Sequence, residues 1–398
     1  MSRRLLSLLA LAGLAGLGLL LILDGCGSDT SEGGSEAPAM CQGGDGECRW
    51  SVQRAVTPGK AGVLVDVSCP APDLCVAVGN EYHGGGLAQV RTGDGWKPVA
   101  EFDQEVKAVS CPTERWCEVI GSAGARSWTL RGRQGSGGAT GWRAEATPPP
   151  SPPGGSEILL NDVYCLSPGD CTVIGIYRRG GYRTYVAHWD GRGWAFEEAV
   201  DRYAGVSHGM LGLACPAVDD CIAVGGYLYK PLMEHWDGER WRLAPAPSPE
   251  GADEAYVVAI SCSSPAACMG VGYVRLDEEV RPFAVRWDGG KWKTMPEPPP
   301  VSGGDTRLHS VSCVSGDECI AVGTLTEGSS TSARESAVTA LWDGSGWTWL
   351  KTPHPQKFSS LAGVSCGPDA GCSAVGWAGS RSVWEDRPTS APLALQLG

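Results

Sequence analysis

Short apolar segments separated by turn-forming residues recur along most of the chain, at intervals of about 50 residues. In each copy, an apolar residue lies two positions before a cysteine, so both side chains point to the same face of a strand. After that cysteine come five turn-forming residues, a second cysteine and a short apolar run that ends at a glycine. This order predicts a two-stranded antiparallel hairpin in each of seven copies. The apolar residues before the first cysteines are Val67, Val109, Val163, Leu213, Ile260, Val311 and Val364.

A hairpin of this length brings its two cysteines to opposed positions, within reach of disulfide geometry. Closing such a loop of about seven residues stabilises the fold by about 2 kcal/mol on the chain-entropy model. Zinc is the alternative, but it favours C-x2-C spacing and more histidines than the 6 in this chain. Of the 17 cysteines, 16 form close pairs. We expect eight disulfides: Cys41 with Cys48, Cys69 with Cys75, Cys111 with Cys117, Cys165 with Cys171, Cys215 with Cys221, Cys262 with Cys268, Cys313 with Cys319, and Cys366 with Cys372.

A tryptophan-led turn follows the cysteine hairpin in four copies. Each begins Trp-Asp-Gly and reaches a second tryptophan five positions after the first. Asp-Gly between apolar strands predicts a two-residue turn with positive φ at both residues, which would set the two indoles diagonally. A four-residue loop would set them directly opposite, and either register makes them one packing unit. The pairs are Trp189 with Trp194, Trp236 with Trp241, Trp287 with Trp292, and Trp342 with Trp347.

Four short antiparallel strands per repeat are typical of a β-propeller blade, so we expect an all-β fold. The last copy ends after a third strand at residues 392–398, whereas residues 45–52 near the N-terminus resemble a fourth strand. An open array of repeats would instead need polar caps at both ends. The sequence therefore predicts a seven-bladed β-propeller with four-stranded blades, whose last blade is closed by the N-terminal strand.

The repeats resemble kelch-type repeats in their Ala-Val-Gly-Gly run at residues 223–226, their aromatic-Asp-x-x-x-Trp element and their proline-rich links. The Ser-Cys-Pro segments at residues 68–70 and 110–112 also resemble repeats of (lipo)proteins exported by high-GC bacteria. The added disulfide and the shorter Trp-to-Trp turn depart from kelch. The resemblance covers residues 41–398 and implies a propeller, but no activity, because this fold hosts many unrelated functions.

The N-terminus predicts export. Arg3 and Arg4 precede an apolar run at residues 5–23, so residues 1–25 fit a signal peptide. Leu23-Asp24-Gly25-Cys26 resembles a bacterial lipobox, with Cys26 as the lipidated residue, although Asp24 replaces the usual small residue. Residues 26–40 would then be a flexible tether. The length of the run keeps an uncleaved transmembrane anchor open, and ordinary secretion is the third alternative. All three place the repeats outside the cytoplasm.

Composition excludes some functions. The net charge of −13 argues against nucleic-acid binding, which needs clustered Lys and Arg. His188 and His235 occupy the same repeat position on different blades, so we expect no shared metal site, no cofactor and no catalytic constellation. The Asp of each Trp-Asp-Gly turn is explained by the turn itself. Acidic residues of the cysteine loops are expected to be solvated turn formers, with calcium binding as the alternative: Asp73, Asp170, Asp219, Asp220, Asp317 and Asp369.

On a propeller, function is expected in the longer, variable connections. One of them mixes cationic and aromatic side chains, which suits anionic or glycan ligands; a plain solvated loop is the alternative. We expect a monomeric, lipid-anchored binding or scaffold module for a protein or glycan partner at the bacterial cell envelope. The alternative is a glycan-acting hydrolase or lyase with carboxylates in the propeller funnel. The candidate partner-binding residues are Tyr177, Arg178, Arg179, Tyr182, Arg183 and Tyr185.

Overall fold

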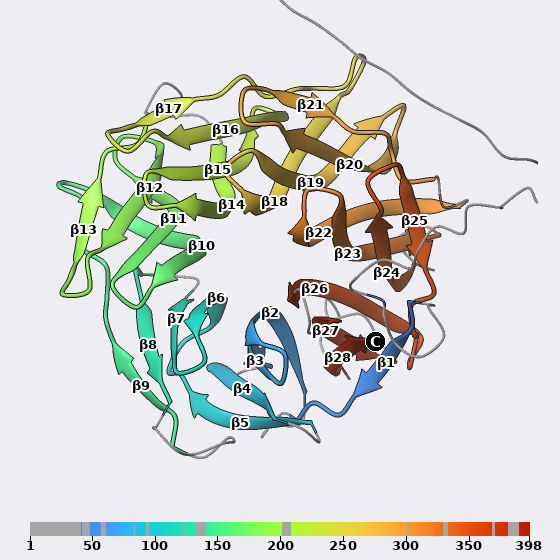
Figure 1. The fold of residues 1–398 in the computed structure, drawn as a ribbon, viewed down its shortest axis with the longest axis horizontal. Coiled ribbons are helices and arrows are strands. Elements are labelled where there is room, and N and C mark those ends of the chain that lie inside the picture. Colours follow the sequence, from blue (N-terminus) through green and yellow to red (C-terminus); the bar gives the residue numbers. More distant parts are fainter. Residues whose placement is uncertain are drawn as a thin grey trace, which may run out of the picture. The chain divides into compact units, whose positions relative to one another are not determined.

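The protein forms seven four-stranded antiparallel sheets that follow one another around a ring (Figure 1). The predictions for residues 1–40, including the signal peptide, the tether and lipidation of Cys26, lie outside the described residues. Within the described part of the chain, no helix is long and apolar enough to cross a membrane. The computed structural model describes residues 41, 48–56, 61–82, 84–92, 95–121, 124–132, 141–200, 208–299, 301, 303–328, 333–367, 371–380 and 390–398.

Each sheet is one blade, and in blades 1 to 6 the strands run from the ring centre outward in sequence order. Blade 1 holds β2 (Gly62–Ala71), β3 (Leu74–Glu81), β4 (Gly86–Thr92) and β5 (Trp96–Glu101). Blade 2 holds β6 (Val106–Thr113), β7 (Trp116–Gly121), β8 (Ser127–Arg131) and β9 (Arg143–Ala146). Blade 3 holds β10 (Ser156–Ser167), β11 (Asp170–Arg178), β12 (Tyr182–Trp189) and β13 (Trp194–Glu197).

The next three blades repeat this order. Blade 4 holds β14 (His208–Ala217), β15 (Asp220–Tyr227), β16 (Lys230–Trp236) and β17 (Trp241–Leu243). Blade 5 holds β18 (Glu254–Ser264), β19 (Ala267–Leu276), β20 (Glu279–Trp287) and β21 (Trp292–Thr294). Blade 6 holds β22 (Gly304–Ser315), β23 (Glu318–Glu327), β24 (Arg334–Trp342) and β25 (Trp347–Leu350).

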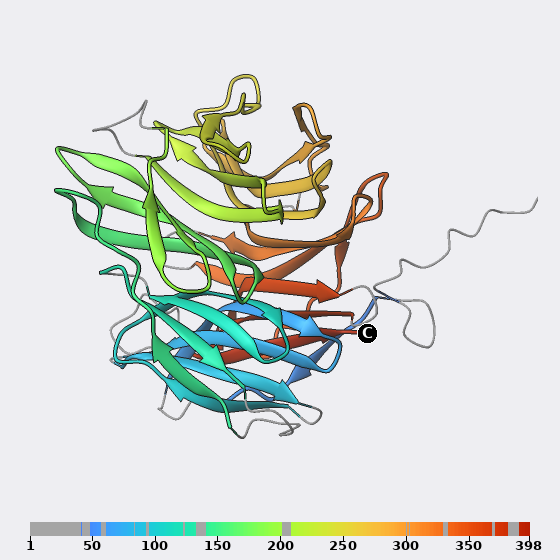
Figure 2. The ribbon, with the colours of Figure 1, turned by 60° about the vertical axis from the view of Figure 1, so that its left-hand side comes forward.

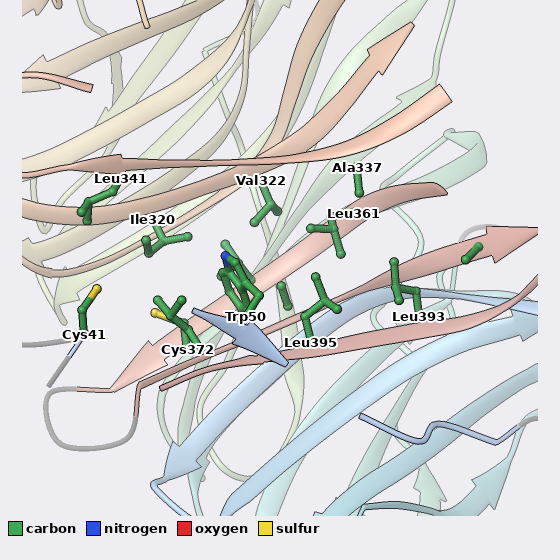
Figure 3. Packing of buried hydrophobic residues seen from close by; sticks show 14 residues of the cluster. Cys41, Trp50, Ile320, Val322, Ala337, Leu341, Leu361, Cys372, Leu393 and Leu395 are labelled. Carbon is green, nitrogen blue, oxygen red and sulfur yellow. The ribbon is translucent and has the colours of Figure 1, made fainter. Parts of the chain in front are cut away.

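The seventh blade combines both ends of the propeller. It holds β26 (Phe358–Gly367), β27 (Gly371–Gly379) and β28 (Ala391–Leu397), and its outermost strand is β1 (Trp50–Gln53). Trp50 lies opposite Leu397 in this pairing and is buried. Its indole N–H donates a hydrogen bond of 3.1 Å to Thr339 Oγ1 in blade 6. Figure 3 shows Trp50 beside Val322 of blade 6 and Leu395 of blade 7. The predicted seven-bladed propeller, closed by its N-terminal strand, is confirmed.

Hydrophobic side chains fill the space between neighbouring blades, and the described residues include one such cluster for each of the seven pairs of neighbours. Strand β15 shows how the sequence achieves this. Cys221 and Ala223 pack toward blade 3, whereas Ile222 and Val224 pack toward blade 5. Because successive side chains of a strand point to opposite faces, a strand covered on both faces is apolar at every position.

The cysteine pairs form the predicted disulfides. Across the β10–β11 hairpin, Cys165 lies opposite Cys171, with Cα atoms 4.0 Å apart. Disulfides in this number are characteristic of proteins that fold in an oxidising environment, as outside the cytoplasm. The eight bonds join Cys41 to Cys48, Cys69 to Cys75, Cys111 to Cys117, Cys165 to Cys171, Cys215 to Cys221, Cys262 to Cys268, Cys313 to Cys319, and Cys366 to Cys372.

The tryptophan-led turn is a four-residue loop, so the two-residue turn is wrong for this chain. Trp189 lies directly opposite Trp194, with ring centroids 5.7 Å apart. Asp190 Oδ1 accepts hydrogen bonds from the backbone N–H groups of Arg192 and Gly193, at 2.9 and 3.0 Å. This side chain therefore closes the turn, and Gly191 has the positive φ, 86°. The other three pairs have the same register.

The register of each blade assigns its connections to two rims. The hairpins between the second and third strands, such as β15–β16, lie at the end where the innermost strand begins; we call this the upper rim. The cysteine hairpins and the Trp-Asp-Gly turns lie at the opposite end, the lower rim. Figure 2 shows the blades turned so that their strands run from one rim to the other. The β11–β12 hairpin, which holds the candidate partner-binding residues, therefore lies toward the upper rim.

Candidate functional site in the central funnel

Every innermost strand contains a β-bulge at the equivalent repeat position. At each bulge, one residue has no partner in the pairing with the second strand. A bulge leaves one residue out of the ladder and re-aims its side chain. The seven bulged residues all line one cavity of about 430 Å³ at the ring centre. We call this cavity the funnel site. The bulged residues are Val65, Lys107, Asn161, Leu211, Val258, His309 and Ala362.

The glycine that ends the second apolar run of each repeat makes this bulge feasible. A Cβ added at Gly175 would overlap the carbonyl oxygen of Leu159 on the neighbouring strand, and one at Gly225 would overlap the carbonyl oxygen of Gly209. The bulged strand approaches its partner too closely here for any side chain. The bulge thus explains the glycine in six of the seven repeats, whereas a Cβ at Gly121 would lie 3.1 Å from its nearest neighbour.

Two aspartates directly after bulged residues bridge neighbouring blades. Asp66 Oδ1 accepts the backbone N–H of Val67 in its own strand, and Oδ2 accepts that of Val109 in blade 2, both at 2.8 Å. Asp162 repeats the arrangement in blade 3: its Oδ2 accepts the N–H of Leu213 in blade 4, at 2.7 Å. In each carboxyl group Oδ1 accepts an N–H of its own strand, and Oδ2 accepts one from the next blade.

Desolvation in the funnel wall raises the pKa of Asp66 to about 6 and that of Asp162 to about 8. For Asp162, the nearby charge of Asp66 adds to the increase, whereas backbone hydrogen bonds and Lys107 oppose it. Burial thus disfavours ionisation of both carboxyl groups, of Asp162 more than of Asp66.

The wall of blade 6 contributes a histidine and an arginine. His309 Nδ1–H donates to the carbonyl oxygen of Leu361 in blade 7, at 3.0 Å. Desolvation, aided by the charge of Arg307, lowers the pKa of His309, so its ring is neutral near pH 7. The Arg307 guanidinium lies over the ring of Tyr273, 5.3 Å from its centroid. Tyr273 packs in turn on Tyr256, with ring centroids 5.3 Å apart.

Apolar side chains form part of the same wall. Leu211 is 37% exposed, which is high for a leucine, and Val258 of the next blade is half-buried beside it in the lining. Tyr273 and Arg307 lie on segments between the bulge and the upper rim, so the site extends toward that rim. The funnel site thus combines an apolar wall, an aromatic ring that carries Arg307, and polar groups of both charges, as ligand sites do.

The structure separates the six candidate partner-binding residues into two groups. Tyr177 and Tyr185 are buried in the cluster between blades 2 and 3, and Tyr185 donates a 2.7 Å hydrogen bond to Pro150 O. They are core residues because strand alternation points them inward. Arg178, Arg179 and Tyr182 are exposed at the upper rim, where Arg178 forms a 3.2 Å ion pair with Glu157. The sixth, Arg183, is half-buried and donates to Arg179 O, at 2.9 Å.

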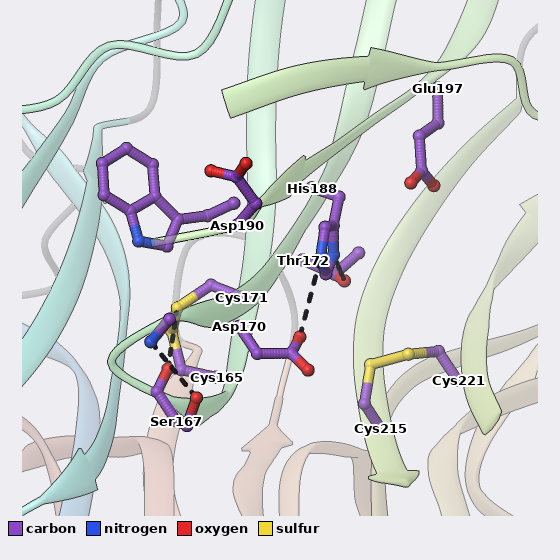
Figure 4. Close-up of polar contacts among 12 residues, drawn as sticks. Cys165, Ser167, Asp170, Cys171, Thr172, His188, Asp190, Glu197, Cys215 and Cys221 are labelled. Atoms are coloured by element: carbon purple, nitrogen blue, oxygen red, sulfur yellow. Dashed lines mark hydrogen bonds and ion pairs between the residues drawn. A yellow bond between two sulfur atoms is a disulfide. The ribbon is translucent and has the colours of Figure 1, made fainter. Parts of the chain in front are cut away.

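The histidines at the shared repeat position each contact an acidic residue of their own blade at the lower rim. His188 Nε2 lies 3.9 Å from Asp170 Oδ1 in blade 3 (Figure 4), and His235 Nε2 lies 2.7 Å from Asp220 Oδ1 in blade 4. A second cavity of about 390 Å³ adjoins His188 and includes Glu197. Among the described residues, no group of three or more His, Cys, Asp or Glu side chains is arranged to hold a metal ion.

The funnel residues were not identified from the sequence, although their position in the repeat could have indicated them. All seven stand four positions before the first cysteine of their repeat, and this position varies from Ala362 to Lys107 inside an otherwise regular pattern. A variable position in a regular repeat marks a place that packing does not dictate.

Comparison with solved structures shows the propeller fold alone. U3-55K has a TM-score of 0.55 at 10% sequence identity, over 87% of this chain and 98% of its own. YCF48 from Cyanidioschyzon merolae has a TM-score of 0.52 at 15% identity, over 87% and 98% of the two chains. Virginiamycin B lyase from Staphylococcus aureus has a TM-score of 0.51 at 9% identity, over 88% and 99%. No family model and no curated protein matches the sequence.

Proposed function

We propose that this protein is an exported binding module that holds part of its ligand in the funnel site, with the upper rim as the surrounding contact surface. The observation that carries the proposal is that all seven bulges direct one variable side chain each into a single cavity. If the seven bulged positions only had to fill the centre of the ring, equivalent apolar residues at all seven would be sufficient. The partner is a protein or glycan of the cell envelope.

The state of the carboxyl groups supports binding over hydrolysis. Glycoside hydrolysis uses two carboxyl groups that are free to act on substrate or water. Here both oxygens of Asp66 and of Asp162 already accept backbone N–H groups from two blades. These side chains therefore act as connections between blades.

Blocking the funnel tests this function. A Leu211→Trp variant adds bulk to the cavity lining, whereas Val218→Trp places the same ring on the lower rim, where Val218 is 67% exposed. We expect envelope fragments captured by the wild-type full chain to be lost with Leu211→Trp and kept with Val218→Trp. Equal capture by all three proteins would exclude the funnel as the binding site.

Exposed side chains of the β11–β12 connection are proposed to extend this contact. Arg178 lies 5.9 Å from the ring centroid of Tyr182, which is 40% exposed. Cationic and aromatic groups in contact suit an anionic or glycan partner.

For export, we propose that residues 1–25 are a signal peptide and that lipidated Cys26 anchors the propeller through the tether at residues 26–40. A Cys26→Ser variant should lose labelling by a fatty-acid probe and, if the signal is still cleaved, leave the membrane fraction. Unchanged labelling would exclude Cys26 as the lipid site. An uncleaved N-terminus would favour the transmembrane anchor.

A second candidate function is a lyase acting on glycans in the same funnel, and His309 favours it. Its Nδ1–H is committed to Leu361 O, so a neutral ring presents Nε2 as a proton acceptor. A lyase would form unsaturated sugar products from uronate polysaccharides, detectable by ultraviolet absorbance. Loss of this product with His309→Gln, while ligand capture persists, would establish the activity; no product from the wild type would exclude it for the substrates tried.

A further inference from the structure

The funnel site holds two cations inside an acidic protein. The whole chain has a net charge of −13, yet the cavity lining holds Lys107 on blade 2 and Arg307 on blade 6. Asp66 and Asp162 stand against them, but burial disfavours the ionised form of both carboxyl groups. The carboxyl groups of the lining therefore balance its cations only in part.

The geometry leaves these cations available to a ligand. Lys107 is exposed, and the carboxyl oxygens of Asp66 and Asp162 accept backbone N–H groups. Arg307 Nη2 lies 3.8 Å from Asp305 Oδ2, with both side chains about one-third or more exposed, and such a pair is weak. An anion that displaces water from the cavity would meet both positive charges at reduced dielectric.

The remaining lining suits a sugar ring. Leu211 and the half-buried Val258 offer an apolar surface, beside the Tyr273 ring that Arg307 covers. His309 Nε2 is an acceptor for a sugar hydroxyl group, and the polar residues Ser310 and Asn161 also line the cavity. The volume of about 430 Å³ is in the usual range for small-ligand sites.

We propose that the funnel site binds a carboxylate-bearing sugar, that is, a uronate unit of an anionic glycan. The carboxylate is held by the charges of Lys107 and Arg307, and the sugar ring packs on Leu211 and Val258. This inference rests on the proposed function, since it names the ligand class of the same site.

Glucuronate and glucose test the inference, because glucuronate has a carboxylate where glucose has a hydroxymethyl group. Calorimetry on the full chain should show glucuronate binding that weakens as salt is raised, and glucose at least about 10-fold weaker. Lys107→Met and Arg307→Met keep the aliphatic stem and should each weaken glucuronate binding by about 10-fold. Lys291→Met, on the exposed β20–β21 turn, is the matched control and should leave it unchanged.

Three outcomes overturn the inference. Equal binding of glucose and glucuronate would show that the carboxylate is not recognised. Binding of N-acetylalanine but not of glucuronate would assign the site to a peptide carboxyl terminus. Absence of binding by either sugar would exclude a uronate site, and if Leu211→Trp still abolished capture of envelope fragments, the proposed function would stand without it.

Discussion

Ser365 Oγ accepts a hydrogen bond of 3.0 Å from the backbone N–H of Cys69, a residue 296 positions away in the sequence. This bond joins blade 7 to blade 1 and so spans the closure of the ring. Four other pairs of neighbouring blades have the same bond. In each, the N–H of the first cysteine of a blade donates to the serine that stands just before the first cysteine of the preceding blade. Blades 3 and 4 have Tyr164 and Ala214 at the serine position.

Removing this acceptor should weaken the closure. Ser365→Ala leaves the partly buried N–H of Cys69 without its partner, which costs about 1 to 3 kcal/mol in the free energy of unfolding. Denaturant unfolding measures the change, with Ser151→Ala on an exposed link as the control. If both variants unfold alike, the bond contributes nothing to closure.

Trp50 should be the main contribution of the N-terminal strand. Trp50→Ala removes a buried indole and its bond to Thr339, with an expected loss of about 3 to 5 kcal/mol. Val52 lies on the same strand but is 52% exposed, so Val52→Ala should change stability by less than about 0.5 kcal/mol. Thermal melting compares them, and similar midpoints would show that the Trp50 side chain does not stabilise the closure of the ring.

Stability should fall as pH rises, because buried carboxyl groups are held protonated. Glu118 is 1% exposed, and desolvation raises its pKa from 4.5 to about 7 despite hydrogen bonds from Thr129 and Thr147. The folded state therefore binds a proton that the unfolded state has lost. This stabilisation is complete below about pH 4.5 and is lost as pH rises through about 7.

The expected loss is on the order of 3 kcal/mol for this residue. Glu118→Gln should remove that part of the pH dependence, since an amide does not titrate. Denaturant unfolding at several pH values from about 4.5 to 8 gives the free energy of unfolding as a function of pH for the wild type and for the variant. The same pH dependence of this free energy in both proteins would contradict a raised pKa of Glu118.

Each hairpin disulfide should contribute about 2 kcal/mol by closing a short loop. A Cys215→Ser, Cys221→Ser double variant should lose that amount in the free energy of unfolding, without change of fold. Intact mass after alkylation, with and without reductant, counts the free thiols. Extensive alkylation before reduction would show that the repeat cysteines are not paired in the mature protein.

The β11–β12 connection offers a matched pair of tyrosines. Tyr182→Ala should leave stability almost unchanged and weaken partner capture, because its side chain is 40% exposed. Tyr185→Ala should lower the thermal midpoint, because that side chain is fully buried. Unchanged capture with Tyr182→Ala, Arg178→Ala and Arg179→Ala would remove this connection from the binding surface.

Local features of the fold were predictable because they depend on residues close in sequence. Cysteine spacing sets the hairpins and disulfides, and the segment around Trp50 could be matched to the strand that the last repeat lacks. The Trp-Asp-Gly turn was predictable as a turn but not in its length. The side chain of Asp190 competes with the backbone for the turn N–H groups, and the sequence pattern did not weigh that contribution.

The sequence alone determined the number of blades, their disulfides and the joining of the two ends, since each follows from a repeated spacing. The tertiary structure decided which side chains meet. A one-residue bulge turns position 309 toward the funnel, whereas regular alternation turns Tyr177 and Tyr185 into the core. Lys107 and Arg307 are 200 residues apart in the chain, and ring closure places them around one cavity. Such contacts depend on how blades pack, because no local spacing encodes the distance between them.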